Sequence, residues 1–259
     1  MKQRMWKLSK YIFYDIVRNK VILAYTVFLF LVSMLLFNLE ENSSKAILSL
    51  LNIQLVTIPL ISMIFATIHY YNSYEFIEML LSQPLSRSRV LWSEFLSTAS
   101  SLILALLLGM GIPILIYNPN ESSLTLLWTG IALTSVCTSL AFFASVHSRD
   151  KARGIGIVLL LWFYFALIYD GLVLMILFNF SDYPLEKITL LLTALNPIDL
   201  ARVSVMLKMD VSALMGYTGA LYKEFFGSVQ GILYSGGIMF LWMLIPILYA
   251  IRGFNRKDL

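Results

Sequence analysis

The chain has 259 residues, of which 59% are hydrophobic and only 13% are charged, and its net charge is +4. Soluble globular domains are roughly 45–50% apolar and about 25% charged, so this composition excludes both a water-soluble fold and an intrinsically disordered chain. The single cysteine, Cys137, excludes a disulfide framework and any CxxC metal or redox site. The composition therefore predicts an integral membrane protein.

Residues 1–20 mix basic side chains with aromatic and aliphatic ones at helical spacing. This pattern predicts a helix that lies in the membrane interface, with a plain positive flank of the first span as the alternative. The apolar run that follows is too long for a signal-peptide core and lacks a small-residue cleavage site, so we expect it to be retained as a span.

Six apolar stretches are long enough to cross a bilayer, whose hydrocarbon core of about 30 Å needs around 20 helical residues. None alternates as barrel strands do, so the sequence predicts an all-α membrane protein with six transmembrane helices in one domain over residues 1–259. The predicted spans are residues 21–39, 46–71, 95–117, 122–146, 154–180 and 225–251.

The distribution of Lys and Arg predicts the orientation of these spans. Fourteen of the nineteen lie in the N-terminal segment, in the loops that contain Arg87 and Arg149, and in the C-terminal tail. Cytoplasmic loops carry such an excess, so both termini are predicted to be cytoplasmic. Topology thus accounts for the basic charge, and no nucleic-acid partner is expected.

The cytoplasmic segment 72–94 predicts two short helices with a break between them. An apolar face at helical spacing precedes Gln83–Pro84, which ends the first helix, and a second helix begins at Ser86. A helix, a proline turn and a second helix at a membrane face suit a docking lever. The alternative is an ordinary connection between two spans.

Two features inside the spans are candidates for contacts. Ser97, Ser101, Ala105 and Gly109 recur at four-residue steps, which favours close helix packing within the chain or between subunits.

Asp170 is the only acidic or basic residue inside the predicted spans. A charge at the bilayer centre costs at least about 2.5–3.5 kcal/mol, which marks such residues as functional candidates. Asp170 falls in the outer part of its span, so a functional contact and a tolerated interfacial acid both stay open.

The extracytoplasmic segment 181–224 is the only long loop, and it contains the pattern of a helix start. Asn196 suits the N-cap, Pro197 the first helical position and Asp199 the positively polarised first turn. An apolar stripe follows, with Arg202 and Lys208 off the stripe. We predict an amphipathic helix on the outer surface, serving either as a platform for a partner or as a lid over its own spans.

The sequence contains little that points to catalysis or to a bound metal. It has no phosphate-binding loop, no HExxH and no Gly-x-Ser-x-Gly, and His69 and His147 are expected to be interfacial anchors. Thioethers bind Cu(I), but Met206, Met209 and Met215 have no Cys or His nearby, and Met also fills apolar stripes. We therefore predict a non-catalytic chain without a metal site.

The stretch from Glu78 to Leu96, EMLLSQPLSRSRVLWSEFL, resembles the permeases of type-2 ABC transporters. Leu81, Pro84, Leu85 and Arg87 occupy characteristic positions of that family. Two departures are that Tyr74-Glu75-Phe76 replaces the usual Glu-Gly-Thr, and that Glu94 replaces a usual Lys. The resemblance implies an elbow helix over residues 1–20 and a coupling helix in 72–94. It also implies ATP and Mg on partner ATPase subunits, with no cofactor on this chain. The implied ATPase-coupling residues are Glu75, Glu78, Pro84, Leu85, Arg87 and Arg89.

Within that family, the stretches LWFYFALIYDGLVLMILF around Asp170 and LNPIDLARVSVM from Leu195 resemble permeases needed for maturation of nitrous-oxide reductase. This implies a homodimer in the bacterial inner membrane, two ATPase subunits and a role in copper–sulfur centre assembly. The implied contacts with a periplasmic copper-maturation partner are Asn196, Pro197, Asp199, Arg202 and Lys208. The alternatives are a type-2 exporter of a drug, lipid or polysaccharide, and an ion-coupled secondary carrier.

Overall fold

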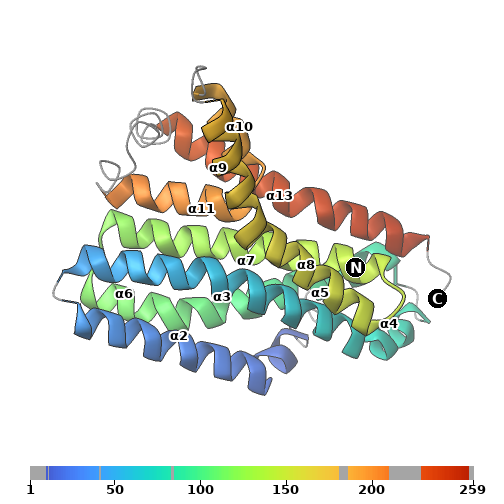
Figure 1. The fold of residues 1–259 in the computed structure, drawn as a ribbon. Coiled ribbons are helices and arrows are strands. Elements are labelled where there is room, and N and C mark those ends of the chain that lie inside the picture. Colours follow the sequence, from blue (N-terminus) through green and yellow to red (C-terminus); the bar gives the residue numbers. More distant parts are fainter. Residues whose placement is uncertain are drawn as a thin grey trace.

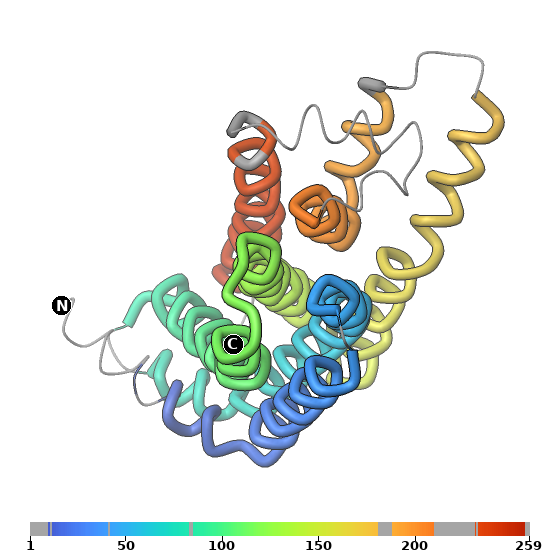
Figure 2. The backbone as a smooth tube through the Cα atoms, turned by 90° about the vertical axis from the view of Figure 1, so that its left-hand side faces the viewer, coloured from blue at the N-terminus to red at the C-terminus, as the bar shows by residue number. Residues whose placement is uncertain are grey.

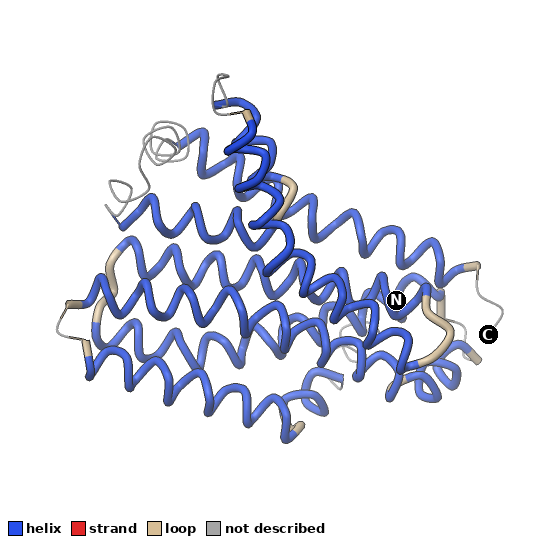
Figure 3. The backbone as a smooth tube through the Cα atoms, viewed as in Figure 1, coloured by secondary structure: helices blue, strands red, loops and turns tan. Residues whose placement is uncertain are grey.

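The computed structural model describes residues 10, 12–40, 42–82, 85–180, 186–209 and 229–256. Within those ranges all regular structure is helical, and six helices are long and apolar enough to cross a membrane (Figures 1 and 3). The prediction of an all-α chain with six candidate spans is confirmed. The spans are α2 (Lys20–Leu39), α3 (Ser43–Asn72), α5 (Arg87–Leu106) continued by η1 (Leu107–Gly111) and α6 (Ile112–Tyr117), α7 (Glu121–His147), α8 (Lys151–Phe163) continued by η2 (Tyr164–Ile168) and α9 (Tyr169–Asn179), and α13 (Val229–Asn255).

The bundle has two ends with different charge. One end carries α4 (Tyr74–Leu81), the turn between α7 and α8, and the end of α13, as Figure 1 shows. Arg87, Arg149 and Arg252 lie at this end, which we call the basic end. The turns from α2 to α3 and from α6 to α7 lie at the opposite end. Half of the predicted N-terminal elbow lies outside the described residues, but residues 12–17 are helical, with Ile12 and Ile16 buried.

Helix α7 is the central element, because it packs against α3, α5, α8, α11 (Pro197–Met206) and α13. Several of its buried hydroxyl groups are satisfied within the helix: the side chains of Thr134, Thr138 and Ser145 each donate to the carbonyl four residues earlier. The Ser139 hydroxyl donates instead to the Met243 carbonyl of α13. Buried polar groups in a membrane protein need such internal partners, since lipid offers none. Small and hydroxyl residues therefore let α7 sit among five neighbours.

The row of small residues in the third span is an internal contact. Ser97, Ser101 and Ala105 are buried in α5. A Cβ added to Gly109 would lie 2.6 Å from the Leu29 Cβ and 3.0 Å from the Thr26 carbonyl oxygen. The chain can place a glycine-containing π-helical turn this close to α2 only because the side chain is missing. Of the two readings open from sequence, packing within the chain is the one that the structure supports.

The segment after α9 corrects the prediction of a surface helix. α10 (Glu186–Ala194) and α11 form a pair bent by 115°, and Figure 2 shows α9 leaning away from the other spans. α11 packs against α7, α3 and α13 instead of lying on the surface. Both its apolar stripe and part of its opposite face are covered. Its one cationic residue, Arg202, is paired within the chain. The buried residues of α11 are Pro197, Ile198, Leu200, Ala201, Val203 and Val205.

Candidate functional site

A cleft at the basic end brings together part of the predicted coupling residues. It measures about 430 Å³ and lies between the end of α4 and the start of α5. α4 is anchored through buried Ile77 and Leu80, so its opposite side is left exposed. The cleft combines an acidic side chain, a basic side chain and an apolar wall. Its lining residues are Glu78, Leu81, Ser82, Leu85 and Arg87.

The other predicted coupling residues lie elsewhere. Glu75 is exposed on the first turn of α4, and Arg89 is half-buried on α5, and neither lines the cleft. Pro84 lies outside the described residues. The sequence therefore grouped six residues of which Glu78, Leu85 and Arg87 meet in one place.

The cleft is tied to the C-terminal end of α13, which sequence reasoning missed. The Arg87 Nη1 atom donates to the Asn255 carbonyl oxygen at 3.4 Å. The Asn255 side-chain amide donates to the Ser88 hydroxyl at 3.0 Å. These contacts join residues more than 160 positions apart in sequence, so no local pattern could have predicted them.

A buried contact between His69 and Glu94 joins α3 to α5. His69 Nε2, at the end of α3, lies 3.1 Å from Glu94 Oε2 on α5. The expectation that His69 is only an interfacial anchor is wrong in this respect, since its ring pairs with a fully buried carboxylate. The one signal in the sequence was Glu94 itself, which departs from the family pattern of the coupling stretch.

A second charged cluster joins α9 to α11. The Arg202 Nη1 atom lies 2.7 Å from Asp170 Oδ2 and 3.0 Å from Asp199 Oδ1. All three side chains are less than one-third exposed. Asp170 is therefore a paired residue that fixes the position of α11, and one cation serves two carboxylates. Of the two readings left open from sequence, this contact favours a specific polar partner.

Asn196 holds the vertex of the α10–α11 pair. Its Oδ1 atom accepts a hydrogen bond from the Ile198 amide, as the predicted N-cap requires. Its Nδ2 atom donates at 2.9 Å to the carbonyl of Phe165, which lies in the π-helical turn η2. Asn196 and Pro197 are both buried, so they offer no surface to a partner, contrary to the expectation from sequence. Asp199, Arg202 and Lys208 keep part of their surface.

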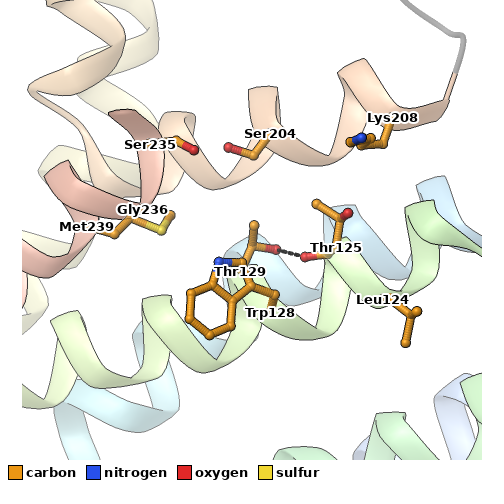
Figure 4. Close-up of a pocket in the computed structure, with 9 residues that line it drawn as sticks. All are labelled: Leu124, Thr125, Trp128, Thr129, Ser204, Lys208, Ser235, Gly236 and Met239. Carbon is orange, nitrogen blue, oxygen red and sulfur yellow. Dashed lines mark hydrogen bonds between the residues drawn. The ribbon is translucent and has the colours of Figure 1, made fainter. Parts of the chain in front are cut away.

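A cavity of about 240 Å³ lies between α7, α11 and α13 (Figure 4). Its Thr129 and Ser204 hydroxyls donate to carbonyls of their own helices, so they offer only acceptor lone pairs to the cavity. Lys208 lies at one end of the cavity, 3.4 Å from the Glu121 carboxylate. The lining residues are Leu124, Thr125, Trp128, Thr129, Ser204, Lys208, Ser235, Gly236 and Met239.

The described residues offer no obvious metal centre. Among them no three His, Cys, Asp or Glu side chains are grouped so as to hold an ion. Of the three methionines considered from sequence, Met209 is buried, Met206 is half-buried and Met215 lies outside the described residues.

Comparison with known proteins places most of this architecture in one group. Residues 76–259 match a family described as ABC-2 family transporter protein. A Pseudomonas aeruginosa protein described as "Probable ABC transporter permease protein NosY" is 32% identical over 148 residues, which are 53% of this chain and 54% of that protein. A protein of the same description from Stutzerimonas stutzeri is 26% identical over 201 residues, 69% of this chain and 67% of its own length. The chain thus spans about half of the first relative and two thirds of the second.

Proposed function

The chain belongs to the ABC-2 family of transporter proteins and is a permease subunit of an ABC transporter, and we propose that it couples ATP hydrolysis by separate cytoplasmic ATPase subunits to movement of α11. The observation that carries this proposal is the cleft with Glu78 and Arg87 on its walls, because an acidic and a basic group beside apolar surface suit a protein partner. ATP and Mg bind to the partner, and this chain binds no cofactor.

A continuous set of packed helices supports transmission from the cleft to the opposite end. α4 contacts α5, α5 contacts α7, and α7 contacts α11. Packed helices shift as rigid elements, so a displacement of one helix can be transmitted to the helix packed against it. The last helix of this series, α11, belongs to the bent α10–α11 pair, whose vertex is held by buried Asn196.

The finer assignment is that this permease serves copper–sulfur centre assembly of nitrous-oxide reductase. It is supported by the description of both relatives and by the sequence likeness around Asp170 and Asn196. In this proposal two copies of the chain bind two ATPase subunits. A periplasmic copper-maturation partner contacts the exposed parts of Asp199, Arg202 and Lys208.

The second candidate is a type-2 exporter of a lipid, drug or polysaccharide. The cavity between α7, α11 and α13 favours it, since its mixed polar and apolar lining suits part of an amphiphilic molecule. Family membership leaves the ion-coupled secondary carrier without support.

We place the basic end in the cytoplasm of a bacterial inner membrane, because cytoplasmic loops carry the excess of Lys and Arg. In a Cys137→Ser background, a membrane-impermeant thiol reagent applied to intact cells is expected to label Glu121→Cys but not Lys151→Cys. Both residues are exposed and lie at opposite ends of the bundle. Permeabilised cells, in which both positions react, are the control. Labelling of position 151 alone in intact cells would reverse the orientation and place the cleft outside.

The functional proposal is tested by deleting the chain in its host and by purifying it with a tag. Tagged protein is expected to retain an ABC ATPase subunit. The deletion strain is expected to accumulate nitrous-oxide reductase that lacks the visible absorption of its copper–sulfur centre, and wild-type chain supplied on a plasmid should restore it. A normal copper centre in the deletion strain would favour the exporter. Purification without any ATPase would contradict the coupling role itself.

A further inference from the structure

The cavity between α7, α11 and α13 carries charge at one end. This end lies at the start of α7, opposite the basic end, where the Ser122 hydroxyl donates to the Lys208 carbonyl at 2.7 Å. Figure 4 shows Lys208 at this end of the cavity and Met239 at the other. Of the residues that line the cavity, Lys208 alone is charged. A ligand that fits therefore places an anionic group at Lys208 and a less polar part deeper.

The deeper wall of the cavity suits a hydrocarbon chain. The hydroxyls of Thr125, Thr129 and Ser204 each donate to the carbonyl four residues earlier in their own helix, so they do not donate into the cavity. Leu124 and Trp128, which also line it, are 50% and 59% exposed. Trp128 lies seven residues into α7, about 10 Å along the helix. Exposed apolar side chains at this depth face lipid, so an acyl chain can pass from the membrane into the cavity.

Lys208 and Glu121 form a loose pair of opposite charges beside the entrance of the cavity. Lys208 Nζ lies 3.4 Å from Glu121 Oε2, and the Glu121 side chain is 85% exposed. Such an exposed pair contributes about 0–1 kcal/mol, so both groups can turn to a ligand at little cost. Glu121 is the first residue of α7 and does not line the cavity, so its carboxylate lies further out than the lining residues. A phosphate at Lys208 with an ammonium group beyond it matches this order of charges.

We propose that the cavity binds one phospholipid with a primary-amine headgroup, phosphatidylethanolamine. Its phosphate accepts hydrogen bonds from the Lys208 ammonium group, its own ammonium group faces the Glu121 carboxylate, and one acyl chain extends past Trp128 toward Met239. The cavity of about 240 Å³ is smaller than the roughly 300–1,000 Å³ of pockets that enclose a whole drug-sized ligand, so it holds part of one chain. This inference goes beyond the proposed function, and only the choice of the outer leaflet rests on the orientation given above.

Lipid retention by the tagged full-length chain, purified with the subunits that it retains, tests the site. The protein is exchanged into detergent with equal amounts of phosphatidylethanolamine, phosphatidylcholine and phosphatidylglycerol of identical chains, and bound lipids are counted by native mass spectrometry. Wild type is expected to retain phosphatidylethanolamine severalfold over the others, because choline has no N–H to donate and the glycerol headgroup carries no cation. Glu121→Gln should remove this preference. Lys208→Ala should lower the retention of all three lipids, because each contains the phosphate.

Gly236→Leu fills the cavity without changing either charge. A Cβ added to Gly236 or to Gly237 meets no atom within 4 Å, so the structure has room for a side chain at both positions. Only Gly236 lines the cavity, which makes Gly237→Leu the matched control. Gly236→Leu should reduce the retention of phosphatidylethanolamine severalfold, whereas Gly237→Leu should stay within twofold of wild type.

Three results would overturn the site. They are equal retention of the three lipids by wild type, equal retention of phosphatidylethanolamine by Gly236→Leu and Gly237→Leu, and displacement of the lipid by phosphoethanolamine, which has the headgroup without the chains. If Gly236→Leu fails to fold, Glu121→Gln decides the matter at an exposed position, and an unchanged lipid preference there would refute the proposal. None of these measurements needs the ATPase or the copper enzyme, so their failure would leave the proposed function standing.

Discussion

Combined charge reversal on the two walls of the cytoplasmic cleft, Glu78→Lys with Arg87→Glu, is expected to lower recovery of the ATPase subunit at least tenfold while the chain still inserts and folds. A tenfold loss corresponds to about 1.4 kcal/mol of binding free energy. Truncation of one partner in a desolvated interfacial charge pair costs roughly 2–5 kcal/mol, so two reversals exceed the tenfold threshold. Glu78 is exposed and Arg87 half-exposed, so the fold itself should be little affected.

The controls for this prediction separate charge from local structure. Ser88→Ala removes a hydrogen-bonding partner of Asn255 without changing the charge of the cleft, and it should keep normal ATPase recovery. Arg149→Glu reverses an exposed charge at the same end but outside the cleft, and it should also bind normally. ATPase recovery is measured by tag purification and normalised to folded permease. Undiminished recovery in the double reversal would place the docking surface elsewhere on the basic end.

The sequence predicted the helical elements well because each depends on local composition. A run of about 20 apolar residues without charge has to become a membrane helix, so both ends of all six predicted spans lie within eight residues of the observed ends. The N-cap of α11 was equally local, since Asn196 and Pro197 act on their own backbone. What failed was the location of α11. A polar and an apolar face describe a helix, but not which distant helix supplies the partner of Arg202.

The sites were predictable to the extent that their residues are close in sequence. Glu78, Leu85 and Arg87, which line one cleft, lie within nine positions of one another in the sequence. The contacts of Asn255 with Ser88, of His69 with Glu94 and of Arg202 with Asp170 span 25 or more positions. The π-helical turns η1 and η2 were also invisible, because each results from packing: η1 lies against α2, and a carbonyl of η2 accepts from Asn196.

The cluster of Arg202, Asp170 and Asp199 carries the second large expected effect. Arg202→Gln leaves two carboxylates facing each other without their cation, and breaking a buried pair in this way costs about 3–5 kcal/mol. We expect a loss near the lower limit, because Arg202 and Asp170 are each about 30% exposed. Asp170→Asn should be milder, since Arg202 then still pairs with Asp199 at 3.0 Å. The double substitution Arg202→Gln with Asp170→Asn should recover at least half of the loss, because one unpaired carboxylate is gone.

Lys208→Glu is the matched comparison at the exposed rim, and it separates the fold from the partner surface. Lys208 faces Glu121, whose side chain is 85% exposed, so its reversal should change the stability by no more than about 0.5 kcal/mol. Stability is read from tryptophan fluorescence during thermal unfolding in detergent.

If the exposed rim contacts a periplasmic partner, Lys208→Glu should reduce copper-centre assembly in cells although the protein stays folded. Arg202→Gln should reduce it by destabilising α11, and the double substitution Arg202→Gln with Asp170→Asn should recover part of both the stability and the assembly. Equal stability of Arg202→Gln and wild type would show that the cluster does not hold α11 in place, and normal copper-centre assembly with Lys208→Glu would remove this rim from the partner surface.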